Sequence, residues 1–198
     1  MKSGIAAVVL AAGASQRMGE QNKLLALWQG KPLVRHVVET SIKANTDQTI
    51  VVTGHEAASM KQTLDGLDVH LVDNPDYREG LSASLKAGVR SVDAECSGAV
   101  ILLADMPRLK VATLNVLIQA FVDCDGRSIC VPICGLRRGN PVIWPRAFFP
   151  DILELNGDQG ARALISRYQG RVLEVPCDDE GVLMDIDTPA DLDSTNNL

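Results

Sequence analysis

Residues able to bind phosphate gather in one loop, between positions 10 and 23. Gly13 and Gly19 allow left-handed backbone conformations, so successive N–H groups can converge on phosphate oxygens. Arg17 adds a forked guanidinium, and Lys23 adds a mobile point charge. The loop is not a Walker loop, because five residues rather than four separate its glycines, and it lacks the second glycine of G-x-G-x-x-G. An ordinary strand-to-helix turn with solvated charges is the alternative.

Acidic side chains that could bind a metal ion lie in two distant segments. Asp105 directly follows the apolar run 99–104, which puts a carboxylate at the end of a buried strand. Asp187, with Asp185 beside it, comes late in the chain. Mg²⁺ commonly takes one or two protein carboxylates and completes its shell with water and substrate phosphates. We therefore expect Asp105 and Asp187 to hold one Mg²⁺, although an Asp before Met-Pro can also simply start a turn.

Two further polar segments have structural alternatives. Thr188 and Asp191 have the spacing of a capping box, so we expect them to start a helix rather than bind a ligand. Residues 74–85 lead from a strand end to a helix start, and Gly80 and Ser84 there could offer hydrogen bonds to a flat heterocycle. Serines near a helix start often serve only as caps.

The apolar pattern predicts the scaffold that positions these residues. Runs of strand length occur at 5–10, 49–53, 69–72, 99–104, 128–132 and 171–175, and helical periodicity occurs at 32–44, 81–92 and 110–122. Strands that alternate with helices predict right-handed crossovers and one three-layer α/β domain over residues 1–198, with a mostly parallel sheet. Ligands of such sheets bind beyond the carboxyl ends of the strands, where Thr53 and the segments described above lie.

Composition excludes several kinds of partner. The 198 residues include 19 Lys plus Arg and 25 Asp plus Glu, which gives a formal net charge of −6. No basic stretch is longer than Arg137-Arg138, so binding to nucleic acid or to an anionic membrane is not expected. No apolar run approaches the ~20 residues of a membrane span.

Cysteine usage points to a reducing compartment. The five cysteines lack the paired spacing of a zinc site, and an odd number argues against a disulfide framework. Residues 2–14 imitate a secretory signal, but their apolar part is at the short end for such a signal. We therefore expect reduced thiols in a cytoplasmic protein.

Six ordered motifs resemble those of the nucleotidyltransferases that act on molybdenum cofactor. They are LAAGxSxRMG, NPDYxxGLxxSL, LxxDMPxL, RGNPV, GDQGAR and DIDTPADL, and the resemblance spans Val8 to Leu192. It is closest to the molybdenum cofactor cytidylyltransferases. This resemblance implies a Rossmann-like nucleotidyltransferase fold and Mg²⁺-dependent transfer of CMP from CTP to molybdopterin, with release of pyrophosphate. An acceptor molybdoenzyme or its chaperone would be a further partner.

The resemblance also implies roles for single residues. Arg17, Lys23 and Asp105 would be catalytic, and Asp105 and Asp187 would bind Mg²⁺. Ser84 would help to read cytosine. The full set expected to contact the nucleotide is Leu10, Ala11, Ala12, Gly13, Arg17, Lys23, Thr53, Gly80, Ser84 and Asp105.

The motifs leave the base and the acceptor open. Three residues separate Gly19 from Lys23, as in the guanylyltransferase relatives, whereas Ala12 in LAAG favours the cytidylyltransferases. GTP is therefore the alternative nucleotide, and another small phosphorylated compound is the alternative acceptor. Asn140 stands where RGHPV has histidine. Arg138 and Arg162 are candidate contacts to an anion, and the alternative is that these arginines only stabilise their loops.

Two functions of other classes compete with nucleotidyl transfer. A dinucleotide-binding oxidoreductase is disfavoured because G-x-G-x-x-G is missing. A nucleotide sensor without catalysis is disfavoured because it has less use for two metal-binding carboxylates.

Overall fold

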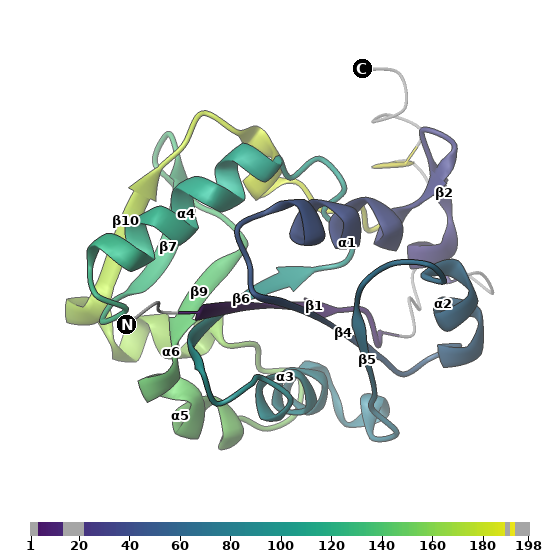
Figure 1. Cartoon of the computed structure of the whole chain (residues 1–198), viewed down its shortest axis with the longest axis horizontal. Helices are drawn as coiled ribbons and strands as arrows, with labels where there is room; N and C mark the ends of the chain where they lie inside the picture. Colours follow the sequence, from purple (N-terminus) through teal and green to yellow (C-terminus); the bar gives the residue numbers. More distant parts are fainter. Residues whose placement is uncertain (1–3, 14–21, 189–190, 193–198) are drawn as a thin grey trace.

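A computed structural model of the chain describes residues 4–13, 22–188 and 191–192 (Figure 1). Arg17 and Gly19 of the loop predicted to bind phosphate lie outside these residues. The strands of the main sheet are β1 (Gly4–Leu10), β4 (Gln48–Thr53), β5 (His70–Asp73), β6 (Cys96–Leu103), β7 (Ile129–Cys134), β8 (Arg137–Arg138), β9 (Val142–Pro145) and β10 (Val172–Pro176). The helices are α1 (Leu33–Lys43), α2 (Ala57–Thr63), α3 (Leu81–Arg90), α4 (Val111–Asp123), α5 (Phe149–Leu153) and α6 (Arg162–Arg167).

The sheet confirms the predicted architecture. Its eight strands run in the order β10-β7-β9-β6-β1-β4-β5, with β8 paired to β7. The pairs β1–β4, β1–β6, β4–β5 and β7–β10 are parallel, so the sheet is mostly parallel. All six predicted strands and all three predicted helices are present, with shifted ends. Pro32, the first residue of the helical pattern at 32–44, precedes α1 as its N-cap residue.

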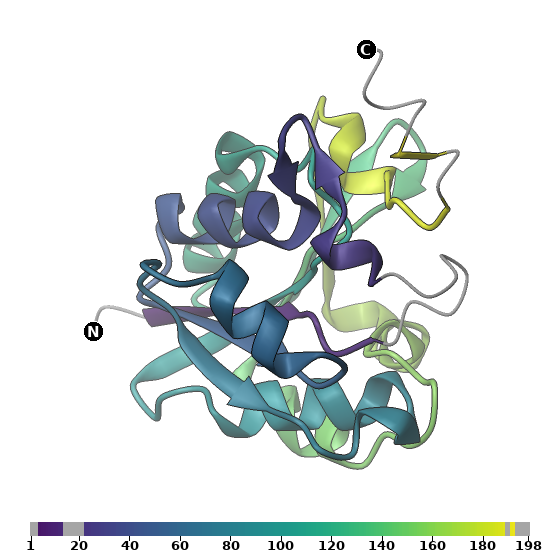
Figure 2. The same ribbon diagram turned by 90° about the vertical axis from the view of Figure 1, so that its right-hand side faces the viewer.

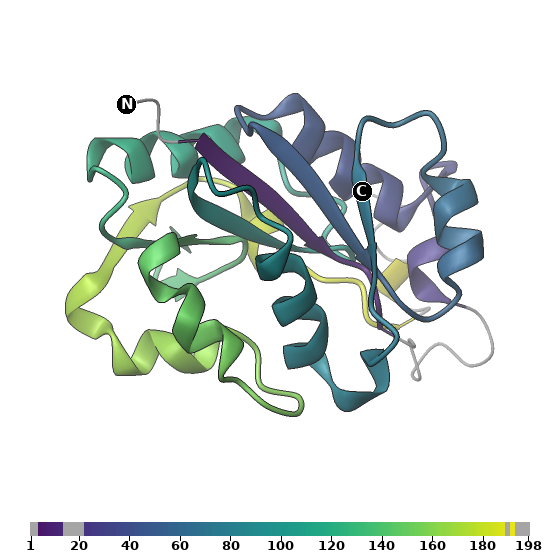
Figure 3. The same ribbon diagram turned by 60° about the horizontal axis from the view of Figure 1, so that its bottom comes forward.

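Burial on both faces explains why the central strand is a continuous apolar run. Along β1, Ile5, Ala7 and Val9 pack on the same side as α1 and α4, whereas Ala6 and Val8 pack on the side of α3. Figures 1 and 3 show the resulting layers, with α1 and α4 covering one face of the sheet and α3, α5 and α6 the other.

Strand β9 is the main element that the apolar pattern did not predict. Its four residues are fully buried and lie antiparallel to β6 and to β7, between these two parallel strands. The strand is short, Pro141 precedes it and Pro145 is its last residue, and these features obscure a strand in sequence. The short helices α2, α5 and α6, strand β8 and the hairpin β2 (Leu27–Trp28) and β3 (Lys31–Pro32) were not predicted either.

The strand order fixes where a ligand can bind. The chain passes from β1 outward through β4 to β5 and then returns to the other side of β1 as β6. Parallel sheets bind ligands in the crevice where the strand order reverses in this way, beyond the carboxyl ends of the strands. Figure 2 looks onto that edge of the sheet. Among the described residues, no helix is long and apolar enough to span a membrane.

Gly88 lets α3 approach the sheet closely, and this contact yields a test of the fold. We expect Gly88→Ala to lower the free energy of unfolding by about 1–3 kcal/mol, because the new methyl group would overlap Val8 Cγ1 and lie 3.0 Å from Val52 Cγ2, both fully buried. That loss exceeds the ~1 kcal/mol that alanine gains over glycine in a helix. Urea unfolding measures it.

The matched control is Gly170→Ala, since a Cβ atom there would meet no heavy atom within 4 Å. Its effect should stay within about 0.5 kcal/mol. Equal stabilities of the two variants would show that α3 does not lie this close to β1.

Candidate active site

A cleft of about 910 Å³ lies at the point where the strand order reverses. Segments that follow β1, β4, β5 and β6 line it, together with the loop before α6 and residues near the end of the chain. Seven of the residues expected to bind the nucleotide line this cleft, namely Leu10, Ala12, Gly13, Lys23, Gly80, Ser84 and Asp105. Asp187, the second expected metal ligand, lines it too.

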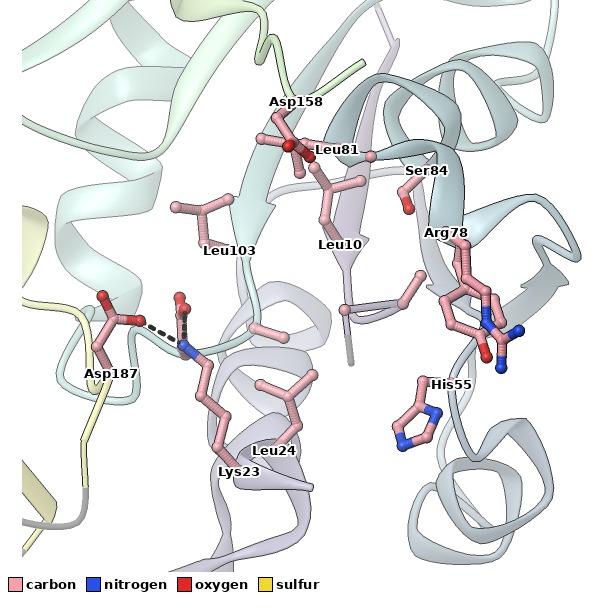
Figure 4. Close-up of a pocket in the computed structure, with 16 residues that line it drawn as sticks. Leu10, Lys23, Leu24, His55, Arg78, Leu81, Ser84, Leu103, Asp158 and Asp187 are labelled. Atoms are coloured by element: carbon pink, nitrogen blue, oxygen red, sulfur yellow. Dashed lines mark hydrogen bonds and ion pairs between the residues drawn. The ribbon is translucent and has the colours of Figure 1, made fainter. Parts of the chain in front are cut away.

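Lys23 joins the two carboxylates at one end of the cleft. Its Nζ atom lies 2.8 Å from Asp105 Oδ2 and 2.7 Å from Asp187 Oδ1 (Figure 4). Lys23 begins a short 3-10 helix that is capped by Asn22, whose side chain accepts a hydrogen bond from the Leu24 N–H group at 3.1 Å. The structure thus brings together three groups that the sequence separates by 82 and 164 residues.

The backbone holds Asp187 beside Asp105. The Ile186 N–H group donates to the Asp105 carbonyl oxygen at 2.9 Å. The predicted capping box is confirmed, because Asp191 Oδ2 accepts from the Thr188 N–H group at 2.8 Å and the Asp191 N–H group donates to Thr188 Oγ1 at 3.2 Å. The Thr188 hydroxyl also donates to Asp191 Oδ2 at 2.7 Å, and this hydrogen bond, together with the one from the Thr188 N–H group, lowers the pKa of Asp191. Asp191 therefore has a structural role.

Burial and ion pairing shift the pKa values of this cluster in opposite directions. Burial raises the pKa of Asp105, an effect that the nearby Lys23 ammonium opposes and the Asp185 charge reinforces. Burial also disfavours the charged form of Lys23, but Asp105 and Asp187 together outweigh it and raise the pKa of the lysine. Lys23 is therefore charged at neutral pH. Asp185 itself is exposed and does not line the cleft.

The donor set fits a hard divalent cation. Asp105 Oδ1 is buried and has no hydrogen-bond partner within the part of the chain that the structure describes. An orphaned carboxylate oxygen is costly unless something positive approaches it. Together with the oxygens now occupied by Lys23, it offers the kind of ligands that Mg²⁺ and Mn²⁺ prefer.

Close packing shapes the other end of the cleft. A Cβ atom on Gly54 would lie 2.7 Å from Tyr77 Cβ and 3.0 Å from Ala12 Cβ, so glycine is needed there. Gly80 has a φ of 105°, and a Cβ atom on it would lie 2.5 Å from the Gly157 carbonyl group. Glycine at these places leaves the loops after β1, β4 and β5 tightly packed around one cavity.

Polar groups at this end come from the segment between β5 and α3. Ser84 is buried, and its Oγ atom accepts a hydrogen bond from Asn74 Nδ2 at 3.1 Å. Arg78 and His55 line the cleft opposite the Lys23 cluster (Figure 4). The His55 N–H group donates to the Ala12 carbonyl oxygen at 3.2 Å, which ties the loop after β4 to the loop after β1.

Some expected nucleotide contacts do not line the cleft. The Thr53 hydroxyl donates to the Val72 carbonyl oxygen at 3.4 Å, and Ala11 is buried in the core on the side of α1. Arg17 lies outside the described residues. In the other direction, seven lining residues were not predicted as individual contacts, although most of them lie within the motifs quoted above: Leu24, His55, Tyr77, Arg78, Leu81, Leu103 and Asp158. Ala104, which was predicted only as the end of a strand, lines the cleft too.

A second pocket of about 100 Å³ adjoins the cleft and shares Leu10, Leu81 and Leu103 with it. Asn140 and Arg162 line this pocket. Arg162 Nη2 donates to the Arg138 carbonyl oxygen at 3.1 Å, whereas the Arg138 guanidinium pairs with Glu174 at 2.7 Å. RGNPV and GDQGAR are thus neighbours beside the cleft, with Arg162 nearer to it than the Arg138 side chain.

Comparison with known proteins identifies relatives of the whole fold. A family model described as "MobA-like NTP transferase domain" matches residues 7–172. The purine catabolism protein PucB of Bacillus subtilis (strain 168) is 34% identical over 94% of this chain and 93% of its own length. The nicotine blue oxidoreductase of Paenarthrobacter nicotinovorans is 27% identical over 93% of this chain and 92% of its own.

One similar solved structure contains a metal ion. The protein Rv0371c of Mycobacterium tuberculosis H37Rv, crystallised in complex with manganese, superposes with a TM-score of 0.77 at 26% identity. The match covers 98% of each chain.

The coupling between Lys23 and Asp105 can be measured by stability. We expect Lys23→Met to lower the free energy of unfolding by about 1–3 kcal/mol, because the buried Asp105 carboxylate loses its counter-charge. Adding Asp105→Asn should restore most of this loss, and a double-mutant cycle in urea isolates the pair.

Lys110→Met is the matched control, since Lys110 Nζ is 3.7 Å from Asp179 but its side chain is 66% exposed. Its cost should stay below about 1 kcal/mol. A double variant no more stable than Lys23→Met alone would contradict the assigned coupling.

Proposed function

From the premise that this chain belongs to the family of MobA-like NTP transferase domains, we propose that it transfers CMP from CTP to molybdopterin. Nucleotidyl transfer is the activity of the family. The use of CTP and the use of molybdopterin are the proposed part. We also propose that the reaction takes place in the cytoplasm. There the five cysteines, all free in the structure, would stay reduced.

One observation carries the proposal, namely that Lys23 bridges Asp105 and Asp187 in a cleft at the reversal point of the sheet. A lysine between two carboxylates is held there until a stronger anion competes for it. A triphosphate is such an anion, and its arrival would draw Lys23 away and leave oxygens of both carboxylates for a divalent cation. The manganese bound by the relative Rv0371c supports a divalent metal in this role.

The reaction needs positioning and charge neutralisation more than a nucleophilic side chain. An oxygen of the acceptor's terminal phosphate bonds to the α-phosphorus of CTP. The bond from that phosphorus to the oxygen that bridges it to the β-phosphorus breaks, and pyrophosphate leaves with that oxygen. Lys23 would hold the triphosphate, and Arg17 would assist it. When bound by Asp105 and Asp187, Mg²⁺ would supply neutralisation of the phosphate charge.

The base and the acceptor would occupy different parts of the cleft. Ala12 and Ser84 support a base at the end away from Lys23, and LAAG favours cytosine over guanine. Asn140 and Arg162 of the adjoining pocket are the groups from which we expect contacts to molybdopterin. An acceptor molybdoenzyme or its chaperone would then receive the product.

Pyrophosphate release tests the proposal. With molybdopterin as acceptor and Mg²⁺ present, we expect CTP to be used at least about 100-fold more efficiently than GTP, ATP or UTP, since hydrogen-bonding sites discriminate strongly between bases. Asp105→Asn should reduce turnover by about 10³-fold, because it removes a charged metal ligand. Equal use of CTP and GTP would refute the cytosine assignment, and normal turnover of Asp105→Asn would exclude its metal role.

The name of one relative favours a second candidate. Because a protein 27% identical over most of the chain is a nicotine blue oxidoreductase, a reduction that consumes NADH or NADPH is the alternative chemistry. The same preparations should be assayed for oxidation of both cofactors with a quinoid dye. Cofactor oxidation without pyrophosphate release from any nucleotide would favour this alternative.

Metal binding provides an independent test of Asp105 and Asp187. Without nucleotide, we expect Mn²⁺ to bind Lys23→Met at least about tenfold more tightly than wild type, since the ammonium no longer competes for the carboxylates. Asp105→Asn in the same background should abolish the gain. Electron paramagnetic resonance of free Mn²⁺ measures both, and an unchanged affinity in Lys23→Met would refute the shared site.

A further inference from the structure

We infer that Asn74 is a positioning residue for the nucleotide base: it fixes the Ser84 hydroxyl as a hydrogen-bond donor toward the cleft. The inference rests on the proposed function, because it assumes that a base occupies the end of the cleft near Ser84. It adds a residue that does not itself line the cleft. Its ligand would be a heterocycle that presents a ring nitrogen or carbonyl acceptor to Ser84.

The position of Asn74 is determined by its backbone. Asn74 directly follows β5 and is 4% exposed. Its N–H group donates to the Thr53 carbonyl oxygen at 2.8 Å, which extends the pairing of β4 and β5 by one residue. Its carbonyl oxygen accepts from the Tyr77 N–H group at 3.3 Å. The side chain therefore starts from a fixed point.

The orientation of the Asn74 amide is determined as well. Its Oδ1 atom accepts a hydrogen bond from the Asp76 N–H group at 3.2 Å. A backbone N–H group can only donate, so the oxygen must face Asp76 and the NH₂ group must face Ser84. The 3.1 Å contact between Nδ2 and Ser84 Oγ therefore has one direction, in which Asn74 donates and Ser84 accepts.

This direction sets what Ser84 can offer. A hydroxyl has one hydrogen and two lone pairs, and Asn74 uses a lone pair. Among the described residues, no group accepts a hydrogen bond from the Ser84 hydroxyl, and this residue is 5% exposed with its side-chain oxygen directed into the cleft (Figure 4). A buried donor without a partner is costly, so Ser84 presents a donor to the ligand.

Cytosine can accept this hydrogen bond on ring nitrogen N3 or on the O2 carbonyl group. Uracil shares O2, but it carries an N–H donor at position 3. This N–H group could pair only with the remaining lone pair of the Ser84 hydroxyl, which would leave the buried hydroxyl hydrogen without an acceptor. The polarity that Asn74 imposes therefore favours CTP over UTP if the hydroxyl faces position 3.

Asn74→Asp reverses the polarity with little change in shape. One carboxylate oxygen still accepts from the Asp76 N–H group, while the other replaces the NH₂ group and accepts from Ser84. The hydroxyl then offers only lone pairs to the cleft. We expect the Kd of CTP, measured by calorimetry with Mg²⁺ present, to rise about 10- to 100-fold. Binding of UTP should weaken less than that of CTP.

Ser84→Ala separates this effect from the added negative charge. In the Ser84→Ala background, Asn74→Asp should change the Kd of CTP by less than about twofold, because the hydroxyl through which it acts is gone. Ser84→Ala alone should weaken CTP binding about as much as Asn74→Asp does. Ser82→Ala is the control on the same helix, since Ser82 is buried but does not line the cleft.

The outcomes distinguish this inference from the proposed function. An unchanged Kd for CTP in Asn74→Asp, or an equal loss with and without Ser84, would overturn the role of Asn74 while nucleotide binding stands. Absence of binding of every nucleotide to the wild type would overturn the proposed function itself. If Asn74→Asp folds incompletely, the ratio of the Kd values of CTP and UTP is still readable, since both refer to the folded fraction.

Discussion

The ion pairs of Lys23 with Asp105 and Asp187 are the interaction on which this end of the molecule depends. β6 is buried on both faces, so the Asp105 carboxylate that follows it is mostly buried and only partly solvated by water. Lys23 supplies the charge, and the hydrogen bond from Ile186 to the Asp105 carbonyl oxygen brings the end of the chain to the same point. A loop near the start and a segment near the end are thereby fixed against the central sheet.

The site has two ends because of the order of the strands in the sheet. β1 lies between β4 and β6, and the chain leaves it toward opposite sides. The Lys23 cluster forms where β6 ends, whereas Asn74 and Ser84 lie beyond β4 and β5. An elongated ligand with an anionic part and a flat polar part can contact both ends only when it lies across the end of β1. Gly13 and Ala12 occur there, and small residues leave room for it.

Sequence predicted the parts of this arrangement that follow from burial. Central strands that are buried on both faces, such as β1, β4 and β6, are continuous apolar runs, so these strands and the location of Asp105 at a strand end could be read directly. The edge strands β5 and β10 are largely exposed and were predicted from short runs of strand length. Strand β9 could not be predicted, because a strand of four residues that follows one proline and ends in another carries too little periodicity. The position of Lys23 between the carboxylates depends on the cap at Asn22 and a 3-10 turn, and Asp158 enters the cleft from a loop. Conformations of this kind arise from tertiary packing, which apolar periodicity does not encode.

Charge explains why the two ligands of such a site should depend on each other. Among the described residues that line the cleft, three carboxylates, of Asp105, Asp158 and Asp187, face the two cations Lys23 and Arg78. A triphosphate that arrives alone meets these carboxylates, and a divalent cation that arrives alone meets the Lys23 ammonium. When both arrive, the lysine can pair with phosphate and the carboxylates with metal, so that each charge has a partner of opposite sign. Under the proposed function, the mildly acidic chain would thus recruit a polyanion without a basic surface, because selectivity for the pair of ligands would arise from a cation that is already in place.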